Sequence, residues 1–242
     1  MRKVSALSML IFPVTRSSKA SDSSEPPGSS SHLKRAIDVS GAALGLLAMI
    51  PVFAIIGLSI YLDSPGPIFF KQERVGINRR RGRGIPPEKE RRSLDRFGRP
   101  IHVYKFRSMV VDAERNTGPV WAASQDNRVT RVGRFLRRTR LDEFPQFWNV
   151  LRGEMSLVGP RPERFFFVQR LKEAIPEYDQ RCNIMPGVTG LAQVRCGYDS
   201  SVESANRKLQ YDLHYVRNRS LSLDFKILAQ TVNVIVRGDG AR

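Results

Sequence analysis

The sequence predicts a helix-rich α+β fold that is held on a membrane by one apolar helix. Three observations favour this class. Residues 39–62 contain no charged side chain. Residues 101–107 alternate between apolar and polar side chains, which is typical of a half-buried strand. The second half of the chain contains several segments with helical periodicity, and the sequence shows no internal repeat.

Residues 1–32 predict a tail that precedes the membrane helix. Residues 1–14 combine a basic start with a short apolar run, which resembles a weak secretory signal. Arg16 and Lys19 follow closely and no A-x-A site is present, which argues against cleavage. Residues 17–31 are rich in serine, proline and glycine, so we expect a disordered tail.

Residues 33–62 are long enough and apolar enough to enter a bilayer, which requires about 20 apolar residues for a spanning helix. Basic residues lie on both sides of this segment, at Lys34 and at Lys71. Basic flanks favour the cytoplasmic side, so a straight span would carry one of them across. Pro51 favours a kink in the helix. The pattern leaves two interpretations open: a kinked, re-entrant helix, or an ordinary single span that tolerates the proline.

The elements after the membrane segment fall in residues 63–240. Residues 63–67, with the sequence Asp-Ser-Pro-Gly-Pro, predict a sharp turn. Residues 68–70 indicate a short strand or an interfacial anchor. Thr130 is a candidate N-cap for the helix that follows it. Helices are expected at residues 131–138, 144–151, 163–175, 205–217 and 222–236.

The charge of the chain requires an anionic partner. Lys and Arg number 40 against 23 Asp and Glu, for a formal net charge of +17. Nucleic acid, an anionic membrane surface and a phosphorylated substrate all fit this charge. Residues 78–99 contain nine basic and three acidic residues, which predicts a basic loop. This loop either contacts anionic lipid headgroups or is a tolerated surface insertion.

Several classes of site are disfavoured by the sequence. Residues 78–96 contain no aromatic side chain, whereas single-stranded nucleic-acid sites use aromatic platforms. Cys182 and Cys196 form no C-x-x-C pair, and the three histidines are scattered, so a zinc site is not expected. We interpret the cysteines as reduced thiols of a cytoplasmic domain. The sequence contains no P-loop, no G-x-G-x-x-G and no H-E-x-x-H.

The adjacent carboxylates Asp142 and Glu143 are the most informative feature of the chain. They precede an apolar segment in which Pro145 fits a first helical turn. A carboxylate at a helix N-terminus stays ionised because it lies at the positive end of the helix dipole. Among so many cations, such a pair suits attack on phosphorus. An acidic helix cap without chemistry is the alternative.

Two further segments are candidate phosphate-binding sites. Arg161 lies between two prolines that stiffen the backbone, and a fixed arginine suits bidentate phosphate binding. A plain turn with a surface charge is the alternative there. Residues 186–194 contain two glycines, which permit close approach of the backbone to a phosphate, although such turns are common. Residues 105–109 are a third segment of moderate interest, for which an ordinary basic-edged strand is the alternative.

Together and in this order, these segments resemble the bacterial sugar transferase family. Its members are the monotopic phosphoglycosyl transferases that start exopolysaccharide, capsule and lipopolysaccharide chains. The resemblance covers about residues 33–240. The matching pieces are residues 34–38, the apolar segment with Pro51, and residues 63–67, 71–76, 105–109, 141–153, 155–162, 186–194 and 211–224.

The resemblance implies a reaction and roles for individual residues. Sugar 1-phosphate would pass from a nucleotide sugar, of the UDP type, to a polyprenyl phosphate, with release of a nucleoside monophosphate. Asp142 resembles the nucleophile that forms an acyl-phosphate, and Glu143 resembles the Mg²⁺ ligand. The substrate-binding residues implied are Lys105, Arg107, Arg140, Arg161, Gly187, Thr189, Gly190 and Gln193.

The resemblance also implies a location. It favours a re-entrant helix broken at Pro51, with residues 63–240 as a catalytic domain on the cytoplasmic face of the bacterial inner membrane. The expected partners are the nucleotide sugar, the polyprenyl phosphate and anionic lipids, but not nucleic acid. Phe165, Phe166 and Phe167 are expected on an interfacial helix. A membrane-anchored basic scaffold or nucleic-acid-binding protein is the alternative function, and no segment indicates which sugar is transferred.

Two departures from the family pattern bear on these expectations. Ile50 precedes Pro51, where some relatives have serine, so the geometry of the helix break is less defined. Residues 78–96 are longer than the short turn usual at this point.

Overall fold

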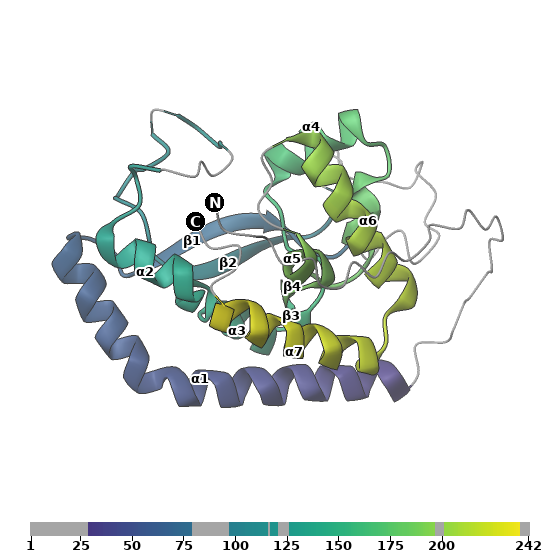
Figure 1. The fold of residues 1–242 in the computed structure, drawn as a ribbon, viewed down its shortest axis with the longest axis horizontal. Coiled ribbons are helices and arrows are strands. Elements are labelled where there is room, and N and C mark those ends of the chain that lie inside the picture. The colour runs from purple at the N-terminus through teal and green to yellow at the C-terminus, as the bar shows by residue number, and fades with distance from the viewer. Residues whose placement is uncertain (1–28, 79–96, 116, 121–125, 197–200, 238–242) are drawn as a thin grey trace, which may run out of the picture.

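The computed structural model describes residues 29–78, 97–115, 117–120, 126–196 and 201–237. They form a helix-rich α+β fold with one long apolar helix, α1, along one side (Figure 1). The predicted fold class is confirmed at this level. Most of the predicted tail (residues 1–28) and most of the basic loop (residues 79–96) lie outside the described residues.

Helix α1 runs from Ser29 to Asp63 and therefore begins before the expected residue 33. Pro51 is the proline inside it, and Figure 1 shows that the helix changes direction part way along. Within the described part of the chain, α1 is the one helix long and apolar enough to cross a membrane, by length and composition. Its exposed large apolar side chains include Leu44, Leu47, Ile50, Ile55, Leu58, Tyr61 and Leu62.

The other helices are α2 (Arg131–Thr139), α3 (Gln146–Leu151), α4 (Phe165–Ala174), α5 (Leu191–Arg195), α6 (Val202–Asn218) and α7 (Leu221–Arg237). Five of these helices confirm the predicted ones, with shifted ends, whereas the short α5 was not predicted. Thr130 Oγ1 accepts the backbone N–H of Gly133 at 3.0 Å, so the predicted cap of α2 is confirmed. Helix α6 begins earlier than expected because Ser201 and Ser204 form a capping box.

Two small sheets lie among these helices. Strands β1 (Phe69–Val75) and β2 (Pro100–Phe106) pair antiparallel along their full length, with Phe69 opposite Phe106 and Val75 opposite Pro100. The predicted strand at 101–107 is thus confirmed, whereas the one at 68–70 is the start of a longer strand. Strands β3 (Ser156–Val158) and β4 (Gly187–Thr189) pair in parallel. They were not predicted, because three-residue strands give no periodicity to read.

Buried polar contacts fix the first part of α1 to the rest of the molecule. Asp38 accepts hydrogen bonds from Ser156 Oγ at 2.8 Å and from the backbone N–H of Leu157 at 3.1 Å. Lys34 Nζ lies 2.7 Å from Asp224 Oδ2 on α7. These contacts compensate for burying the Asp38 carboxylate, which is 4% exposed.

The end of α1 is fixed to the same body. Asp63 Oδ2 accepts the backbone N–H of Val132 at 2.9 Å, at the first turn of α2. Between the two ends, Gly45 lets α1 approach α3 closely, since a Cβ there would lie 2.4 Å from the ring of Phe147. Both ends of the apolar helix therefore bind one folded unit.

The phenylalanines of α4 do not form the expected interfacial patch. Phe165 stacks on Phe97 with ring centroids 5.6 Å apart, and both Phe165 and Phe167 pack against a buried cluster. Phe166 alone of the three is exposed, and α4 lies on the side of the molecule away from α1 (Figure 1). The expectation is wrong for Phe165 and Phe167, because their rings pack against the protein core.

Candidate active site

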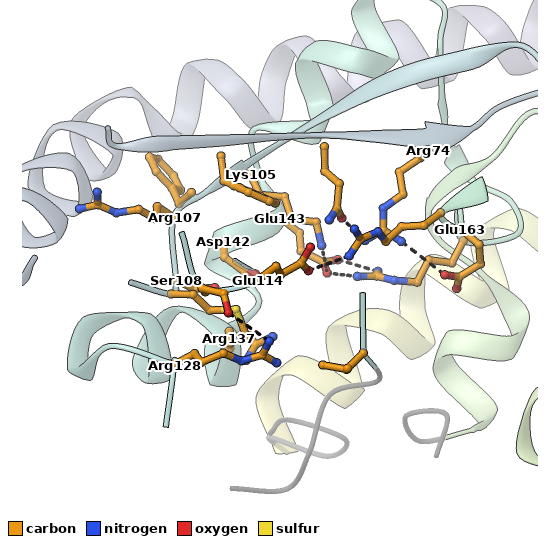
Figure 2. Close-up of a pocket in the computed structure, with 18 of the residues that line it drawn as sticks. Arg74, Lys105, Arg107, Ser108, Glu114, Arg128, Arg137, Asp142, Glu143 and Glu163 are labelled. Atoms are coloured by element: carbon orange, nitrogen blue, oxygen red, sulfur yellow. Dashed lines mark hydrogen bonds and ion pairs between the residues drawn. The ribbon is translucent and has the colours of Figure 1, made fainter. Parts of the chain in front are cut away.

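A pocket of about 840 Å³ contains the two carboxylates (Figure 2). It is lined from β1, β2, the segment after β2, α2, α4 and α6, so residues from most of the chain contribute to it. Many of its lining side chains are ionisable. The basic ones are Arg74, Lys105, Arg107, Arg115, Arg128, Arg137, Arg140, Arg161, Arg164 and Lys208, and the acidic ones are Asp112, Glu114, Asp142, Glu143 and Glu163.

Asp142 and Glu143 lie in a 3₁₀ turn, Leu141–Glu143, between α2 and α3. Arg140 ends α2 with a φ of 61°, a left-handed conformation that reverses the chain direction. The expected position at the N-terminus of an α-helix is therefore corrected. Helix α3 begins at Gln146, and Pro145 is its N-cap rather than part of its first turn.

Glu143 is surrounded by cations. Arg161 Nη1 lies 3.0 Å from Glu143 Oε2, and Arg161 Nη2 contacts Oε1. Lys105 Nζ lies 3.3 Å from the same Oε1. Burial would raise the pKa of Glu143, but the charges of Arg161 and Lys105 outweigh it and hold the pKa well below its usual range. Glu143 is therefore a carboxylate throughout the physiological pH range.

Asp142 behaves differently from its neighbour. Burial, together with repulsion from Glu143, raises the pKa of Asp142 to about 6, although Lys105, Arg161 and Arg137 oppose the shift. The sequence predicted that a helix N-terminus would keep this group ionised. The prediction missed the burial of the 3₁₀ turn, in which Asp142 is only 7% exposed. At neutral pH most of Asp142 is still ionised.

The structure brings four of the predicted substrate-binding residues to the pocket beside the carboxylates, namely Lys105, Arg140, Arg161 and Gln193. Arg107 also lines it, but its guanidinium donates to the backbone carbonyls of Ser64 and Pro65, at 3.3 Å for Pro65. Figure 2 shows this side chain extending away from Asp142 and Glu143. Arg107 therefore holds the turn that follows α1.

The predicted residues Gly187, Thr189 and Gly190 lie outside the lining of this pocket. A Cβ on Gly187 would lie 2.1 Å from the backbone nitrogen of Gly159, and one on Gly190 would lie 2.2 Å from its carbonyl oxygen. Thr189 Oγ1 bonds Thr231 Oγ1 at 2.7 Å. These glycines are thus explained by close packing of β4 against the backbone that leads to Arg161, rather than by contact with a phosphate.

The sequence reasoning missed the contribution of β1. Gln72 and Arg74 both line the pocket, and Arg74 Nη1 donates to the Pro162 carbonyl and to Glu163 Oε2, each at 3.3 Å. Burial lowers the pKa of Arg74 to about 10, so it stays charged. Gln72 and Arg74 are two residues apart, so in a strand their side chains point to the same face. This spacing indicates a shared site only when the strand is known to extend to Val75.

The acidic side chains of the pocket suit a metal ion that takes most of its ligands from water and substrate. Among the described residues, no group of three or more His, Cys, Asp or Glu side chains could hold a metal ion. Mg²⁺, however, commonly uses one or two carboxylates, several waters and the phosphates of a substrate. Asp142 and Glu143 offer such a pair. The donor set therefore fits a Mg²⁺ ion that is shared with a phosphorylated ligand.

Comparison with known proteins gives consistent matches. A model described as "bacterial sugar transferase" matches residues 29–238. The chain is 39% identical over 210 residues to a UDP-N-acetylgalactosamine-undecaprenyl-phosphate N-acetylgalactosaminephosphotransferase of Aeromonas hydrophila, covering 87% of this chain and 45% of that protein. It is 41% identical over 202 residues to a UDP-glucose:undecaprenyl-phosphate glucose-1-phosphate transferase of Escherichia coli K12, covering 83% of this chain and 39% of that protein.

A shorter relative matches nearly from end to end. The exopolysaccharide production protein PSS of Rhizobium leguminosarum bv. phaseoli is 39% identical over 214 residues, covering 86% of this chain and 98% of the relative. The chain thus spans less than half the length of the first two relatives but almost all of this one.

Proposed function

The chain belongs to the bacterial sugar transferase family, and from this membership we propose that it transfers sugar 1-phosphate from a UDP-sugar to undecaprenyl phosphate and releases UMP. This reaction would be the first membrane step of exopolysaccharide, capsule or lipopolysaccharide synthesis. One observation carries the proposal: the pocket places an ionisable, buried Asp142 beside Glu143 and among Lys105, Arg137 and Arg161. That arrangement suits a carboxylate nucleophile and a diphosphate substrate.

The first step in the proposed mechanism is attack by Asp142 on the β-phosphorus of the donor. An oxygen–phosphorus bond forms to the carboxylate, and the bond from this phosphorus to the bridging oxygen breaks, so UMP leaves. The product is an aspartyl-phosphosugar. Lys105 and Arg161 neutralise the phosphoryl oxygens as charge moves to the leaving group, which is the usual role of fixed cations in phosphoryl transfer.

The second step uses the lipid acceptor. An oxygen of undecaprenyl phosphate attacks the phosphorus of the intermediate, and the bond to Asp142 breaks. The carboxylate returns to its starting state, and the product is undecaprenyl diphosphate sugar. A covalent carboxylate intermediate divides one displacement into two and predicts ping-pong kinetics.

Magnesium would be held by Glu143 together with phosphate oxygens of the donor. When bound, the ion supplies positive charge that stabilises the phosphoryl oxygens. Glu143 suits this role because its pKa lies well below the usual range, so the carboxylate carries its charge at any working pH. Arg161 and Lys105, which bind Glu143 in this structure, are the cations that would turn to the phosphates.

The attachment of α1 supports a re-entrant, monotopic position on the membrane. Asp38 near its start and Asp63 at its end both bind the same folded unit. A straight span would place these two residues on opposite sides of the bilayer. A helix bent at Pro51 keeps both ends on one side of the bilayer. We place that side at the cytoplasmic face of the inner membrane, because the basic residues that flank the helix favour the cytoplasm.

The exposed face of α2 supports contact with anionic lipid headgroups. Arg131, Arg134, Phe135 and Arg138 fall at positions i, i+3, i+4 and i+7, and all four are exposed. Helix α2 contacts α1 and contains no acidic residue. This stripe combines cations with one aromatic side chain, as interfacial helices do.

The experiment that tests the proposal measures isotope exchange. The chain in lipid nanodiscs would be incubated with Mg²⁺, labelled UMP and a panel of UDP-sugars, without acceptor lipid. We expect label to enter one UDP-sugar, because the first step is reversible by itself, and UMP release on addition of undecaprenyl phosphate. Asp142→Asn should abolish both. No exchange and no release with any donor would overturn the proposal.

A further inference from the structure

Exposed apolar side chains form part of the pocket lining. Phe69, Phe70, Val110 and Val111 are 51%, 44%, 44% and 49% exposed, and all four line the pocket that contains Asp142. We call these four residues the apolar lane. Single exposed apolar residues are ordinary, but several that line one polar pocket indicate a ligand with an apolar part.

The apolar lane begins at the membrane helix. Phe53 of α1 packs edge-on against Phe106, with ring centroids 4.8 Å apart, and Phe106 stacks on Phe69 at 5.2 Å. Val111 lies beside the turn that follows α1, since a Cβ on Gly66 would lie 2.9 Å from its Cγ2. Phe69 and Val111 therefore lie near the second half of α1, whose exposed side chains include Ile55, Leu58 and Leu62.

The apolar lane ends at the cations that surround the carboxylates. Phe70 is paired with Lys105 across the β1–β2 ladder, so the two side chains are neighbours on one face of the sheet. Lys105 Nζ in turn lies 3.3 Å from Glu143. Phe69 and Phe106 form the next pair and lie on the opposite face, so Phe70 is the member of the lane that lies beside these cations. The complement of such a lining is a phosphate on a hydrocarbon chain.

We propose that the apolar lane binds the isoprene units next to the phosphate of the lipid acceptor and guides that phosphate to Asp142. The inference rests on the proposed function, to which it adds a binding site. The donor, with a nucleoside and a sugar, is polar throughout. Polar residues that also line the pocket, among them Arg164, Gln193 and Lys208, suit the donor instead.

The first test compares two double variants that replace the same residue types. Phe70→Ser with Val111→Ser alters the apolar lane. Phe225→Ser with Val232→Ser removes the same residue types from the exposed surface of α7, where they are 55% and 62% exposed and lie outside the pocket lining. We expect the lane variant to raise the KM for undecaprenyl phosphate about tenfold or more with an unchanged KM for the donor. The α7 variant should leave both constants unchanged.

A second test is independent of turnover. A short polyprenyl phosphate with a diazirine on its first isoprene unit would be cross-linked to the wild-type chain and to Asp142→Asn, and the labelled peptides would be mapped by mass spectrometry. We expect label at residues 69–70 and 110–111 in both proteins. Excess undecaprenyl phosphate should compete with it, whereas phosphatidylglycerol should not.

Several outcomes would overturn the apolar lane. They are an unchanged acceptor KM in an active lane variant, an equal rise in the α7 variant, label at other residues, and equal competition by phosphatidylglycerol. These outcomes are distinct from failure of the proposed function, which would appear as wild-type protein without exchange or UMP release. Cross-linking still decides whether the lane binds an isoprenoid phosphate in that case.

Discussion

Arg161 binds both carboxylate oxygens of Glu143, with Nη1 at 3.0 Å from Oε2 and Nη2 in contact with Oε1. The backbone of Arg161 is fixed separately, because its carbonyl accepts a hydrogen bond from the buried Arg181 at 2.9 Å. Arg181 is in turn paired with Asp212 on α6 at 2.8 Å. The guanidinium can therefore turn from Glu143 to a substrate phosphate while its attachment point stays in place.

Replacing Arg161 should weaken donor binding. A charge-assisted, bidentate contact contributes about 1.5–3 kcal/mol, so Arg161→Ala should raise the KM for the nucleotide sugar roughly 10- to 100-fold. Arg161→Lys keeps the charge but loses the bidentate guanidinium, so its donor KM should lie between those of the wild type and Arg161→Ala. Steady-state kinetics with varied donor measures this effect. Arg170→Ala, an exposed arginine of α4, is the matched control. An unchanged donor KM in Arg161→Ala would show that the guanidinium serves the fold alone.

Replacing Glu143 should affect both catalysis and stability. Glu143→Gln should raise the Mg²⁺ concentration needed for half-maximal activity and severely lower kcat. It also leaves Lys105 and Arg161 without their carboxylate, which should cost about 1–3 kcal/mol of the free energy of unfolding. Magnesium titrations and urea unfolding measure the two effects. A stable, fully active variant with normal magnesium dependence would contradict the assigned role.

Activity should depend on pH through Asp142. Its pKa is raised to about 6, so the nucleophile is protonated below that value, and exchange of UMP with the UDP-sugar should fall as the pH is lowered through about 6. Exchange rates between pH 5 and pH 8 measure the profile. A rate that is flat through pH 6 would show that another group limits the first step.

The same shift predicts an effect on stability. The folded state binds the Asp142 proton more tightly than the unfolded chain, so this group contributes stability at low pH that is lost as the pH rises through about 6. Asp142→Asn should therefore raise the melting temperature at pH 7.5 while it abolishes turnover. Glu177→Gln, at an exposed site, is the control and should change neither. A melting temperature that falls in Asp142→Asn would contradict the assigned cost of burying this charge.

The re-entrant position of α1 can be tested by labelling. His32→Cys and Pro65→Cys place thiols at exposed positions near the two ends of the helix, in a chain whose native cysteines are buried or half-buried. A membrane-impermeant maleimide should modify both in inside-out vesicles and neither in intact spheroplasts. Modification of one thiol from each side would identify a straight span instead.

The sequence was most informative where structure depends on near neighbours. Thr130 signals the start of α2 because its hydroxyl accepts the backbone N–H of Gly133, only three residues along the chain. Thr189 and Gly190 were misinterpreted because their partners, Thr231 and Gly159, are distant in the chain. Arg74 was missed for the same reason, since its place beside the carboxylates depends on pairing of β1 with β2. Local sequence propensity does not predict such long-range contacts.

The candidate site shows the same contrast between features set by neighbouring residues and features set by distant contacts. Asp142 and Glu143 were identified because adjacency is visible in a sequence. The difference between their pKa values was not, since it arises from which carboxylate faces Arg161 and Lys105 in the folded molecule. Arg107 shows the reverse case. A basic residue on a promising strand turned out to hold the backbone of a turn.

The parallel pairing of β3 with β4 has a consequence for the order in which the chain folds. Residues 159–186 separate the two strands, and Arg161 follows β3 directly. Such a pairing forms only after a large loop has closed, which is slower than forming helices such as α2 and α3. During synthesis Asp142 and Glu143 therefore leave the ribosome well before the strand that fixes their arginine partner. Until β4 has been synthesised and has paired with β3, the two carboxylates lie in an incomplete site. The chain therefore becomes catalytically competent late in folding.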